Sequence, residues 1–283
     1  MVIYTKSKEK EKNMITGKNI VLTGCNSGIG LEVLKLLVQG SNKILAVDKN
    51  ISNIISFPSD KVIPMQTDVS SKEAVDAIFE KAEAELGFID IFYANAGYPY
   101  YEEFNYADWD RVAAMFETNV YSPIYSYSKY AKHLDGRKGV YAITVSAIGT
   151  MAMPGYTIYS ASKFAMHGFQ EGLRFELPSN IQLTCLYPIA TDTNFFITAN
   201  DKVDFKKPFP VQQPDVVARK MVEGIEKGKK IVCPSMLFSF SKQLMKFVPP
   251  VKTAYLALEK RKFNEFKRNI AAKAVEKLSV VKK

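Results

Sequence analysis

The amino-acid sequence predicts an α/β fold in which helices cover both faces of a doubly wound parallel sheet. Short apolar runs alternate along the chain with longer segments whose apolar residues recur at helical spacing. The first apolar run, residues 20–22, passes through a glycine-rich turn directly into such a helical segment. Strand, turn and helix in that order are typical of a parallel sheet, whose strands are buried on both faces and are therefore apolar throughout.

Three segments are expected along the 283 residues. Residues 1–16 form a Lys- and Glu-rich tail that we expect to be poorly ordered, and they lack the apolar stretch of a signal peptide. Residues 17–235 form the α/β domain, which we expect to be catalytic, and residues 236–283 form a helical, basic extension. The chain has only three cysteines and no Cys-x-x-Cys pair, which favours a reducing compartment and hence a cytoplasmic location.

The turn after the first strand has the composition of a phosphate-binding loop. Residues 23–30 read Thr-Gly-Cys-Asn-Ser-Gly-Ile-Gly, and a helical pattern that includes Leu34 and Leu37 follows them. Glycines let the backbone turn tightly and approach a pyrophosphate, whose charge is stabilised by the N-terminus of the next helix. The turn therefore predicts a dinucleotide site, although ordinary strand-to-helix turns also contain glycines.

A second apolar run, residues 43–48, ends in Asp48, 18 residues after Gly30. At that spacing a carboxylate hydrogen-bonds the ribose hydroxyls of an adenine dinucleotide and repels a 2′-phosphate. Lys49 follows directly, and its positive charge would offset part of that repulsion. Asp48 therefore favours NAD over NADP as the cofactor, while a role as a simple turn former stays open.

Tyr159 and Lys163, four residues apart, predict a site for proton transfer. Residues i and i+4 of a helix share a face, so the phenol and the ammonium would point the same way. A free tyrosine has a pKa of about 10 and is a poor base at neutral pH. A nearby cation stabilises the phenolate, so we expect Lys163 to lower the pKa of Tyr159.

In order and spacing, the motifs between residues 17 and 195 resemble those of the short-chain dehydrogenase/reductase family, in its single-domain branch. The matching motifs are Thr23-Gly-x-x-x-Gly28-Ile29-Gly30, Asp68-Val69, Asn95-Ala96-Gly97, Asn119, Ser146 and Tyr159-x-x-x-Lys163. The resemblance implies a Rossmann-type sheet and four catalytic residues, Asn119, Ser146, Tyr159 and Lys163. It implies cofactor contacts by Thr23, Gly24, Asn26, Ser27, Gly28, Ile29, Gly30, Asp48, Asp68, Val69, Asn95, Ala96, Gly97, Tyr159, Lys163, Pro188 and Thr193. One departure is Ile189, which follows Pro188 where family members usually carry glycine.

The reaction implied by the resemblance is hydride transfer between a nicotinamide and a secondary alcohol or its ketone. Tyr159 would exchange the hydroxyl proton, Ser146 would hydrogen-bond the substrate oxygen, and Asn119 would position a water that relays the proton through Lys163. The expected substrate pocket is apolar, which favours a lipid-, steroid- or acyl-like substrate, although these residues could simply cover the core. Its residues are Tyr98, Met151, Met153, Tyr156, Phe195 and Phe196. We expect no metal, and the resemblance implies a homodimer or homotetramer.

The basic charge of the chain is concentrated towards its C-terminus. The net charge is +9, whereas residues 219–283 alone contain seventeen Lys and Arg and five Glu. A basic segment suits nucleic acid, an anionic membrane surface or plain solvation. No nucleic-acid motif accompanies the segment, so nucleic acid is the least favoured partner.

An amphipathic helix is expected just before the basic tail. Residues 237–248 place bulky apolar side chains on one half of a helical wheel, interrupted by Ser241, and Lys242 and Lys246 on the other half. The two prolines at 249 and 250 end this helix, and a second, more basic helix is expected from Tyr255. The pattern favours packing on the domain or on a second subunit over peripheral membrane contact. Both interpretations stay open.

Two functions other than catalysis also stay open. A protein of this fold could bind the nucleotide without turning over a substrate and act as a regulator. It could also be a membrane-docked scaffold that acts through residues 236–283. The complete set of four catalytic residues favours an enzyme over both.

Overall fold

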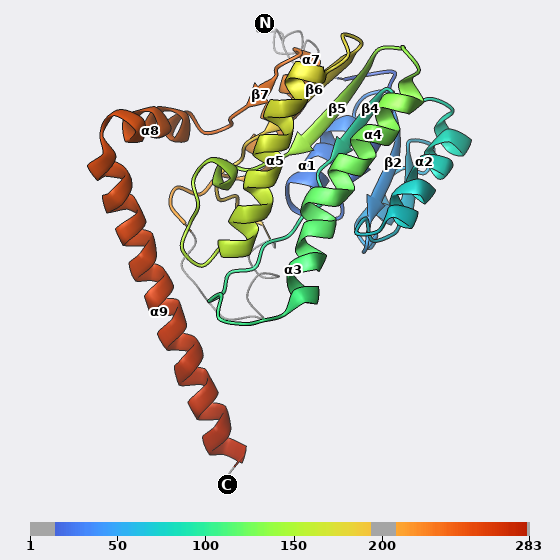
Figure 1. Cartoon of the computed structure of the whole chain (residues 1–283). Coiled ribbons are helices and arrows are strands. Elements are labelled where there is room, and N and C mark those ends of the chain that lie inside the picture. The colour runs from blue at the N-terminus through green and yellow to red at the C-terminus, as the bar shows by residue number, and fades with distance from the viewer. Residues whose placement is uncertain (1–14, 194–207, 282–283) are drawn as a thin grey trace, which may run out of the picture.

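The computed structural model describes residues 15–193 and 208–281, and seven strands in these ranges form one parallel sheet (Figure 1). The strands are β1 (Asn19–Thr23), β2 (Lys43–Asp48), β3 (Val62–Gln66), β4 (Ile91–Ala94), β5 (Gly139–Thr144), β6 (Ile181–Leu186) and β7 (Ile231–Val232). Their order across the sheet is β3-β2-β1-β4-β5-β6-β7, with every neighbouring pair parallel. This arrangement confirms the predicted doubly wound fold.

Helices cover both faces of the sheet. The described helices are α1 (Gly28–Leu37), α2 (Lys72–Leu86), α3 (Trp109–Phe116), α4 (Ser122–Leu134), α5 (Thr157–Glu176), α7 (Pro214–Glu226), α8 (Met236–Phe247) and α9 (Pro249–Val281). Short 3₁₀ turns occur at η1 (Ile54–Ser56) and η3 (Ala147–Thr150), and a π-helical turn, η2 (Glu117–Tyr121), joins α3 to α4. Apolar side chains of α2, α4 and α5 pack on one face of the sheet, and those of α1 and α7 pack on the other.

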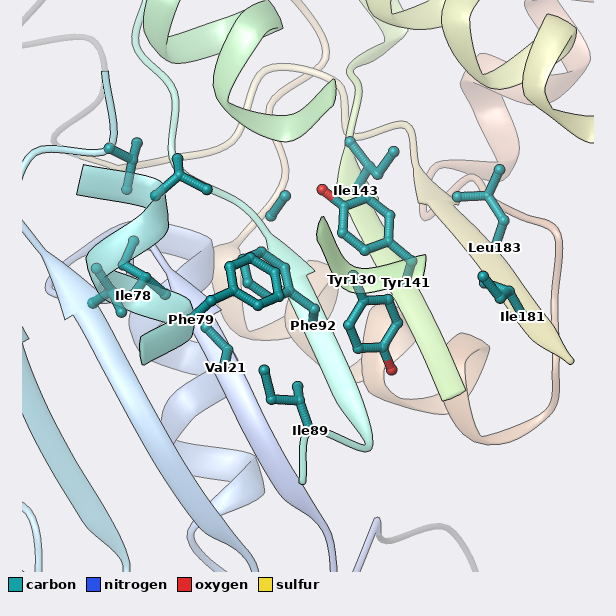
Figure 2. Packing of buried hydrophobic residues seen from close by; sticks show 14 of the residues in the cluster. Val21, Ile78, Phe79, Ile89, Phe92, Tyr130, Tyr141, Ile143, Ile181 and Leu183 are labelled. Carbon is teal, nitrogen blue, oxygen red and sulfur yellow. The ribbon is translucent and has the colours of Figure 1, made fainter. Parts of the chain in front are cut away.

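Aromatic rings dominate the core on the face covered by α2, α4 and α5. The ring of Phe92 in β4 stacks on Phe79 of α2 and on Tyr141 of β5, with centroids 5.2 Å and 5.6 Å away (Figure 2). Burying a large apolar side chain contributes about 1.5–3 kcal/mol, so this stack is a substantial part of the core. Tyr130 of α4 adds a fourth ring, and its hydroxyl donates a hydrogen bond to the Asp90 carbonyl at 2.6 Å. The one polar atom of that ring is therefore satisfied.

The winding of the sheet reverses between β1 and β4, where an open α/β sheet forms a crevice at the carboxyl ends of its strands. Two glycines let the turn from β1 into α1 close tightly at this crevice. Gly24 has a φ of +66°, and a Cβ there would lie 2.6 Å from the Ala96 Cα. A Cβ on Gly30 would lie 2.0 Å from the Gly24 carbonyl oxygen. Any side chain at either position would push the turn away from the crevice.

Residues just before the predicted domain boundary at residue 17 already pack on the domain. The Ile15 side chain is buried, and its carbonyl accepts a hydrogen bond from Asn42 Nδ2 at 2.8 Å. The Thr16 hydroxyl accepts a hydrogen bond from the Ser41 N–H at 3.1 Å. Residues 15 and 16, predicted to belong to the tail, therefore already contact the domain.

The C-terminal extension consists of α8 and α9, which lie along one side of the domain (Figure 1). Helix α9 begins at Pro249 and not near Tyr255 as expected, because proline is tolerated in the first turn of a helix. Phe266 of α9 is buried, and its ring centroid lies 4.6 Å from that of Tyr101. The middle of α9 therefore packs on the domain. In the described ranges, no helix combines the length and the apolar character needed to cross a membrane.

Candidate active site

A cavity of about 500 Å³ opens at the carboxyl ends of the strands, beside the turn from β1 into α1. This volume is typical of cofactor and small-molecule sites. Most residues that the sequence predicts for the cofactor and the substrate line the cavity. They are Gly24, Ser27, Gly28, Ile29, Gly30, Asp48, Asp68, Val69, Asn95, Ala96, Gly97, Tyr98, Ser146, Met151, Met153, Tyr156, Tyr159, Lys163, Pro188 and Thr193. The fold therefore brings distant parts of the sequence to one place.

Thr23 and Asn26, predicted to contact the cofactor, do not line the cavity. Thr23 Oγ1 accepts hydrogen bonds from the N–H groups of Asn95 and Ala96, both at 3.1 Å. Asn26 Oδ1 accepts a hydrogen bond from the Asn53 N–H at 2.8 Å. These side chains fix the glycine turn to its neighbouring loops. The predicted lid residues Phe195 and Phe196 lie outside the described residues.

Asp48, at the end of β2, is held in a defined orientation. Its Oδ2 accepts a hydrogen bond from the Asn26 N–H at 2.9 Å, and its Oδ1 accepts one from the Asn50 N–H at 3.1 Å. Lys49 also lines the cavity, and its ammonium lies 5.9 Å from the centroid of the Tyr98 ring. The carboxylate and the ammonium therefore both border the same cavity.

Tyr159 and Lys163 lie on one face of α5, as their spacing predicts, and both are buried. Lys163 Nζ lies 5.8 Å from the centroid of the Tyr159 ring and donates a hydrogen bond to the Thr144 carbonyl at 3.1 Å. A hydrogen bond from the Ser146 side chain acts on the Tyr159 phenol. Phenol, hydroxyl and ammonium therefore meet at the end of β5.

Ser146 adopts a backbone conformation that is rare for a residue with a side chain. Its φ is +120°, and such a conformation costs about 1–3 kcal/mol. Its Oγ accepts a hydrogen bond from the Ile148 N–H at 3.3 Å, at the start of η3. The strain places the serine hydroxyl beside Tyr159, and strained residues of this kind cluster at functional sites.

Burial dominates the pKa values of the two groups on α5. Burial raises the pKa of Tyr159 above its ordinary range, and the hydrogen bond from Ser146 opposes that effect only in part. Burial also lowers the pKa of Lys163, to about 8. Desolvation of the phenolate is thus the largest influence on Tyr159 in the protein alone. That Lys163 lowers the pKa of Tyr159 stays a prediction.

Asn119 lies in the π-helical turn η2, and such turns are frequent at functional sites. Its Nδ2 donates hydrogen bonds to the Tyr98 carbonyl at 2.9 Å and to Ser162 Oγ at 3.2 Å. Its Oδ1 accepts a hydrogen bond from the Tyr98 N–H at 3.1 Å. The Asn119 side chain therefore ties the loop after β4 to α5. A water held by Asn119 stays a prediction.

One end of the cavity is lined by residues that no sequence motif indicates as site residues. They are Ile148, Ile189, Ala190, Pro208, Phe209, Pro210, Leu237, Phe238, Ser241, Met245 and Tyr255. Helix α8 contributes four of them. In the sequence, the amphipathic pattern predicts this helix but not its position at the cavity. Ile189, the departure from the family pattern, lines the cavity as well. Within the described ranges, no cluster of His, Cys, Asp or Glu could hold a metal.

Tyr156, at this apolar end, has a polar atom without a partner. The side chain is buried and lines the cavity, and among the described residues its hydroxyl has no hydrogen-bond partner. Its ring centroid lies 6.1 Å from that of Tyr159. An unsatisfied buried hydroxyl costs about 1–3 kcal/mol, so a ligand that hydrogen-bonds Tyr156 would recover that cost.

Comparison with known proteins gives one consistent family. Residues 18–204 match the short chain dehydrogenase family. An uncharacterized oxidoreductase of Staphylococcus saprophyticus is 28% identical over 234 residues, which cover 77% of this chain and 94% of that protein. The 3-dehydrosphinganine reductase of Danio rerio is 28% identical, with 76% of this chain and 70% of that protein covered. Estradiol 17-beta-dehydrogenase 11 of Homo sapiens is 24% identical, with coverages of 90% and 86%.

Solved structures share the fold. A short chain dehydrogenase from Burkholderia cenocepacia in complex with NADP has a TM-score of 0.73 at 22% identity, covering 86% of this chain and 98% of its own. A short chain dehydrogenase/reductase from Burkholderia phymatum in complex with NAD has a TM-score of 0.72 at 19% identity, with coverages of 84% and 95%. These two structures do not choose between the two cofactors. The match over residues 18–204, on this sheet and around this cavity, shows that the chain belongs to the short-chain dehydrogenase family of oxidoreductases.

Proposed function

We propose that the protein transfers a hydride between NAD(H) and an apolar secondary alcohol or its ketone. The observation that carries this proposal is the convergence of Tyr159, Ser146 and Lys163 in a cavity that Asp48 and the glycine turn also line. Alcohol oxidation needs one group that exchanges the hydroxyl proton and another that stabilises charge on the oxygen. The buried phenol and the serine hydroxyl beside it supply these two groups.

Each side chain has a separate role in this proposal. Tyr159 exchanges a proton with the substrate oxygen, and Ser146 donates a hydrogen bond to the same oxygen. Lys163 holds the nicotinamide ribose and provides the charge next to Tyr159. Asn119 positions the loop after β4 and holds a water that passes the proton onwards through Lys163.

The glycine turn and the end of β6 fit a dinucleotide. Gly28 has a φ of +55°, and a Cβ there would lie 3.1 Å from Thr193 Cγ2, so the helix start and Thr193, another predicted cofactor contact, are adjacent. The N-terminus of α1 adds partial positive charge for a pyrophosphate. When bound, the nicotinamide supplies the hydride acceptor or donor, and its oxidised ring carries a positive charge that favours the Tyr159 phenolate.

The Asp48 carboxylate is the proposed determinant of NAD preference. We expect Asp48→Ala to weaken NADH binding about ten- to hundredfold, because hydrogen bonds to a charged group contribute about 1.5–3 kcal/mol. NADPH binding should weaken far less, since the variant also removes repulsion of the 2′-phosphate. Fluorescence titration of the purified wild type and variant with both cofactors measures this difference.

Asp60→Ala is the matched control, because Asp60 is exposed and does not line the cavity. It should leave both affinities unchanged. A wild-type preference for NADPH would show that the Lys49 charge outweighs Asp48 and would overturn the NAD assignment. If the wild type bound neither cofactor, the enzyme proposal itself would fail.

An apolar substrate is supported by the lining of the cavity beyond the catalytic groups. Met151, Met153, Phe238 and Met245 surround that end, and methionines adapt readily to irregular apolar ligands. Two relatives are named for dehydrosphinganine and estradiol, and both of these molecules are largely apolar. A lipid-, steroid- or acyl-like alcohol or ketone suits this lining.

The unpaired Tyr156 hydroxyl favours a substrate with a second oxygen. We expect Tyr156→Phe to lower kcat/KM about fivefold for an apolar ketone with a second hydroxyl or keto group, since one hydrogen bond contributes about 1 kcal/mol. Turnover of the matched ketone without that second oxygen should be unchanged. Steady-state rates with the two ketones test this prediction, and an equal loss for both would contradict it.

Two further parts of the proposal come from the sequence. The family resemblance leads us to propose a homodimer or homotetramer, and the cysteine content leads us to propose a cytoplasmic location. Sedimentation equilibrium of the purified protein measures the first, and fractionation of the producing cells measures the second.

A further inference from the structure

We propose that α8 docks the protein on an anionic phospholipid surface. In this arrangement its exposed apolar side chains insert among the lipids, and flanking basic side chains contact the headgroups. The docking step rests on the exposed surface of α8 and on the basic charge of the C-terminal region, independently of the proposed function. Its consequence for catalysis, described below, also rests on the proposed function.

Helix α8 has apolar side chains on two different faces. The inner face lines the cavity through Phe238 and Met245. Ser241, which interrupts the apolar pattern in the sequence, also lies on this inner face, and its hydroxyl donates a hydrogen bond to the Phe238 carbonyl at 3.1 Å. The polar interruption at Ser241 therefore lies on the cavity side and does not divide the apolar outer face of the helix.

The outer face is exposed to solvent, and we call it the apolar ridge. It consists of Met236, Phe240, Leu244 and Phe247. Phe240 is 69% exposed and Phe247 is 82% exposed, whereas most large apolar side chains of the domain are buried. Leu237 and Val248 continue the exposed apolar surface at the two ends of the helix. Contiguous exposed apolar patches of this kind mark protein–protein or membrane contacts.

Exposed cations lie on α8 itself and along α9. Lys242 lies on α8 opposite the ridge, and Lys252, Lys260, Arg261 and Arg268 follow on α9, all exposed. In the part of the chain that the structure describes, none of the five forms an ion pair, whereas Lys262 and Lys267 pair with Glu259 and Glu103. An amphipathic helix with bulky apolar residues and nearby lysines binds the interface of anionic bilayers.

Charge also argues against a second copy of the chain as the occupant of the apolar ridge. Residues 219–283 contain seventeen Lys and Arg and only five Glu. A symmetric contact through α8 would bring two such segments together, and like charges repel. An anionic lipid surface has the complementary charge. The ridge and the cations together therefore favour a membrane over self-association.

Docking through the apolar ridge would place the cavity next to the lipids. Phe238 and Met245 line the cavity, while Phe240 and Phe247, on the same helix, are exposed and do not line it. If the proposed apolar substrate is correct, only the width of α8 separates the membrane from the apolar end of the cavity, where the substrate would bind. An apolar alcohol or ketone would then enter from the bilayer without crossing water.

Vesicle flotation tests the docking step directly. The full chain is mixed with vesicles of phosphatidylcholine alone or with about one third phosphatidylserine. We expect binding to the anionic vesicles that weakens with added salt. The double variant Phe240→Ser, Phe247→Ser should lower the partition coefficient at least tenfold, because two aromatic rings no longer insert among the lipids.

Phe175→Ser is the matched control, because Phe175 on α5 is 93% exposed and lies outside the cavity. It should bind the anionic vesicles as the wild type does. Equal loss in the control and the double variant, or equal binding to both kinds of vesicle, would overturn the proposal. If the wild type does not bind vesicles, and the double variant no longer forms the wild-type oligomer, the ridge binds a second copy of the chain instead.

Rates of turnover distinguish a failure of this inference from a failure of the proposed function. Neither Phe240 nor Phe247 lines the cavity, so the double variant should reduce a water-soluble ketone at the wild-type rate. Reduction of an apolar ketone held in anionic vesicles should fall about tenfold, in line with the lost binding. Equal rates with the vesicle-held ketone would overturn substrate entry from the bilayer. Vesicle binding without any turnover would leave docking in place and refute the proposed function.

Discussion

Tyr159→Phe is expected to lower kcat about a hundred- to ten-thousandfold and to leave the Kd for NADH within about twofold, since a positioned acid–base group contributes about 10²–10⁴ in rate. The substitution removes one oxygen from a buried ring that packs near Tyr156, so the fold should tolerate it. Initial rates of ketone reduction and fluorescence titration with NADH measure the two quantities.

Tyr121→Phe is the matched control, because Tyr121 is 60% exposed and does not line the cavity. It should change neither quantity. Retained turnover in Tyr159→Phe would move proton transfer to another group. A wild type that binds NADH but turns over no alcohol or ketone would support the silent regulator.

The parts of the fold and the site that depend on local pattern could be predicted from the sequence. The strand at 43–48 is apolar because it is buried on both faces, and the structure has it at the same residues, Lys43–Asp48. The turn with Gly24 and Gly30 leaves no space for a Cβ, so glycine there directly reflects backbone geometry. The i, i+4 spacing places Tyr159 and Lys163 on one face wherever α5 lies.

The parts that depend on tertiary packing could not be predicted in the same way. The apolar half of α8 is one surface in the sequence, yet the structure divides it between the cavity, through Phe238, and solvent, through Phe240. Burial changes the pKa values of Tyr159 and Lys163, and spacing contains no information about burial. The strained φ of Ser146 likewise arises from the path of the chain between β5 and η3.

Lys163→Met is expected to make the protein more stable at pH 7 in the absence of cofactor. Burial lowers the pKa of Lys163 from 10.5 to about 8, which means that keeping the ammonium charged in the folded state costs about 3 kcal/mol. The variant also loses the hydrogen bond to the Thr144 carbonyl, which offsets about 1 kcal/mol. We therefore expect the free energy of unfolding to rise by about 2 kcal/mol, measured by urea denaturation.

The pH dependence identifies the cause of this gain. Below about pH 8, Lys163 is protonated in both the folded and the unfolded chain, so the full cost is present. Between about pH 8 and 10.5 the unfolded chain binds more protons than the folded one, so wild-type stability rises with pH and the advantage of Lys163→Met disappears. Lys43→Met, at an exposed position, should show no such trend. A stability difference that stays constant with pH would contradict desolvation as the cause.

The same variant should lose at least about a hundredfold in kcat, because the proton transfer through Tyr159 loses its neighbouring charge. Gain of stability and loss of turnover in one substitution would show why a buried ammonium is kept at this position. A structural lysine would give the opposite result, since removing it would unfold the protein and spare the rate of the molecules that remain folded. The two measurements, urea denaturation and initial rates on the same preparation, therefore separate a chemical role of Lys163 from a packing role.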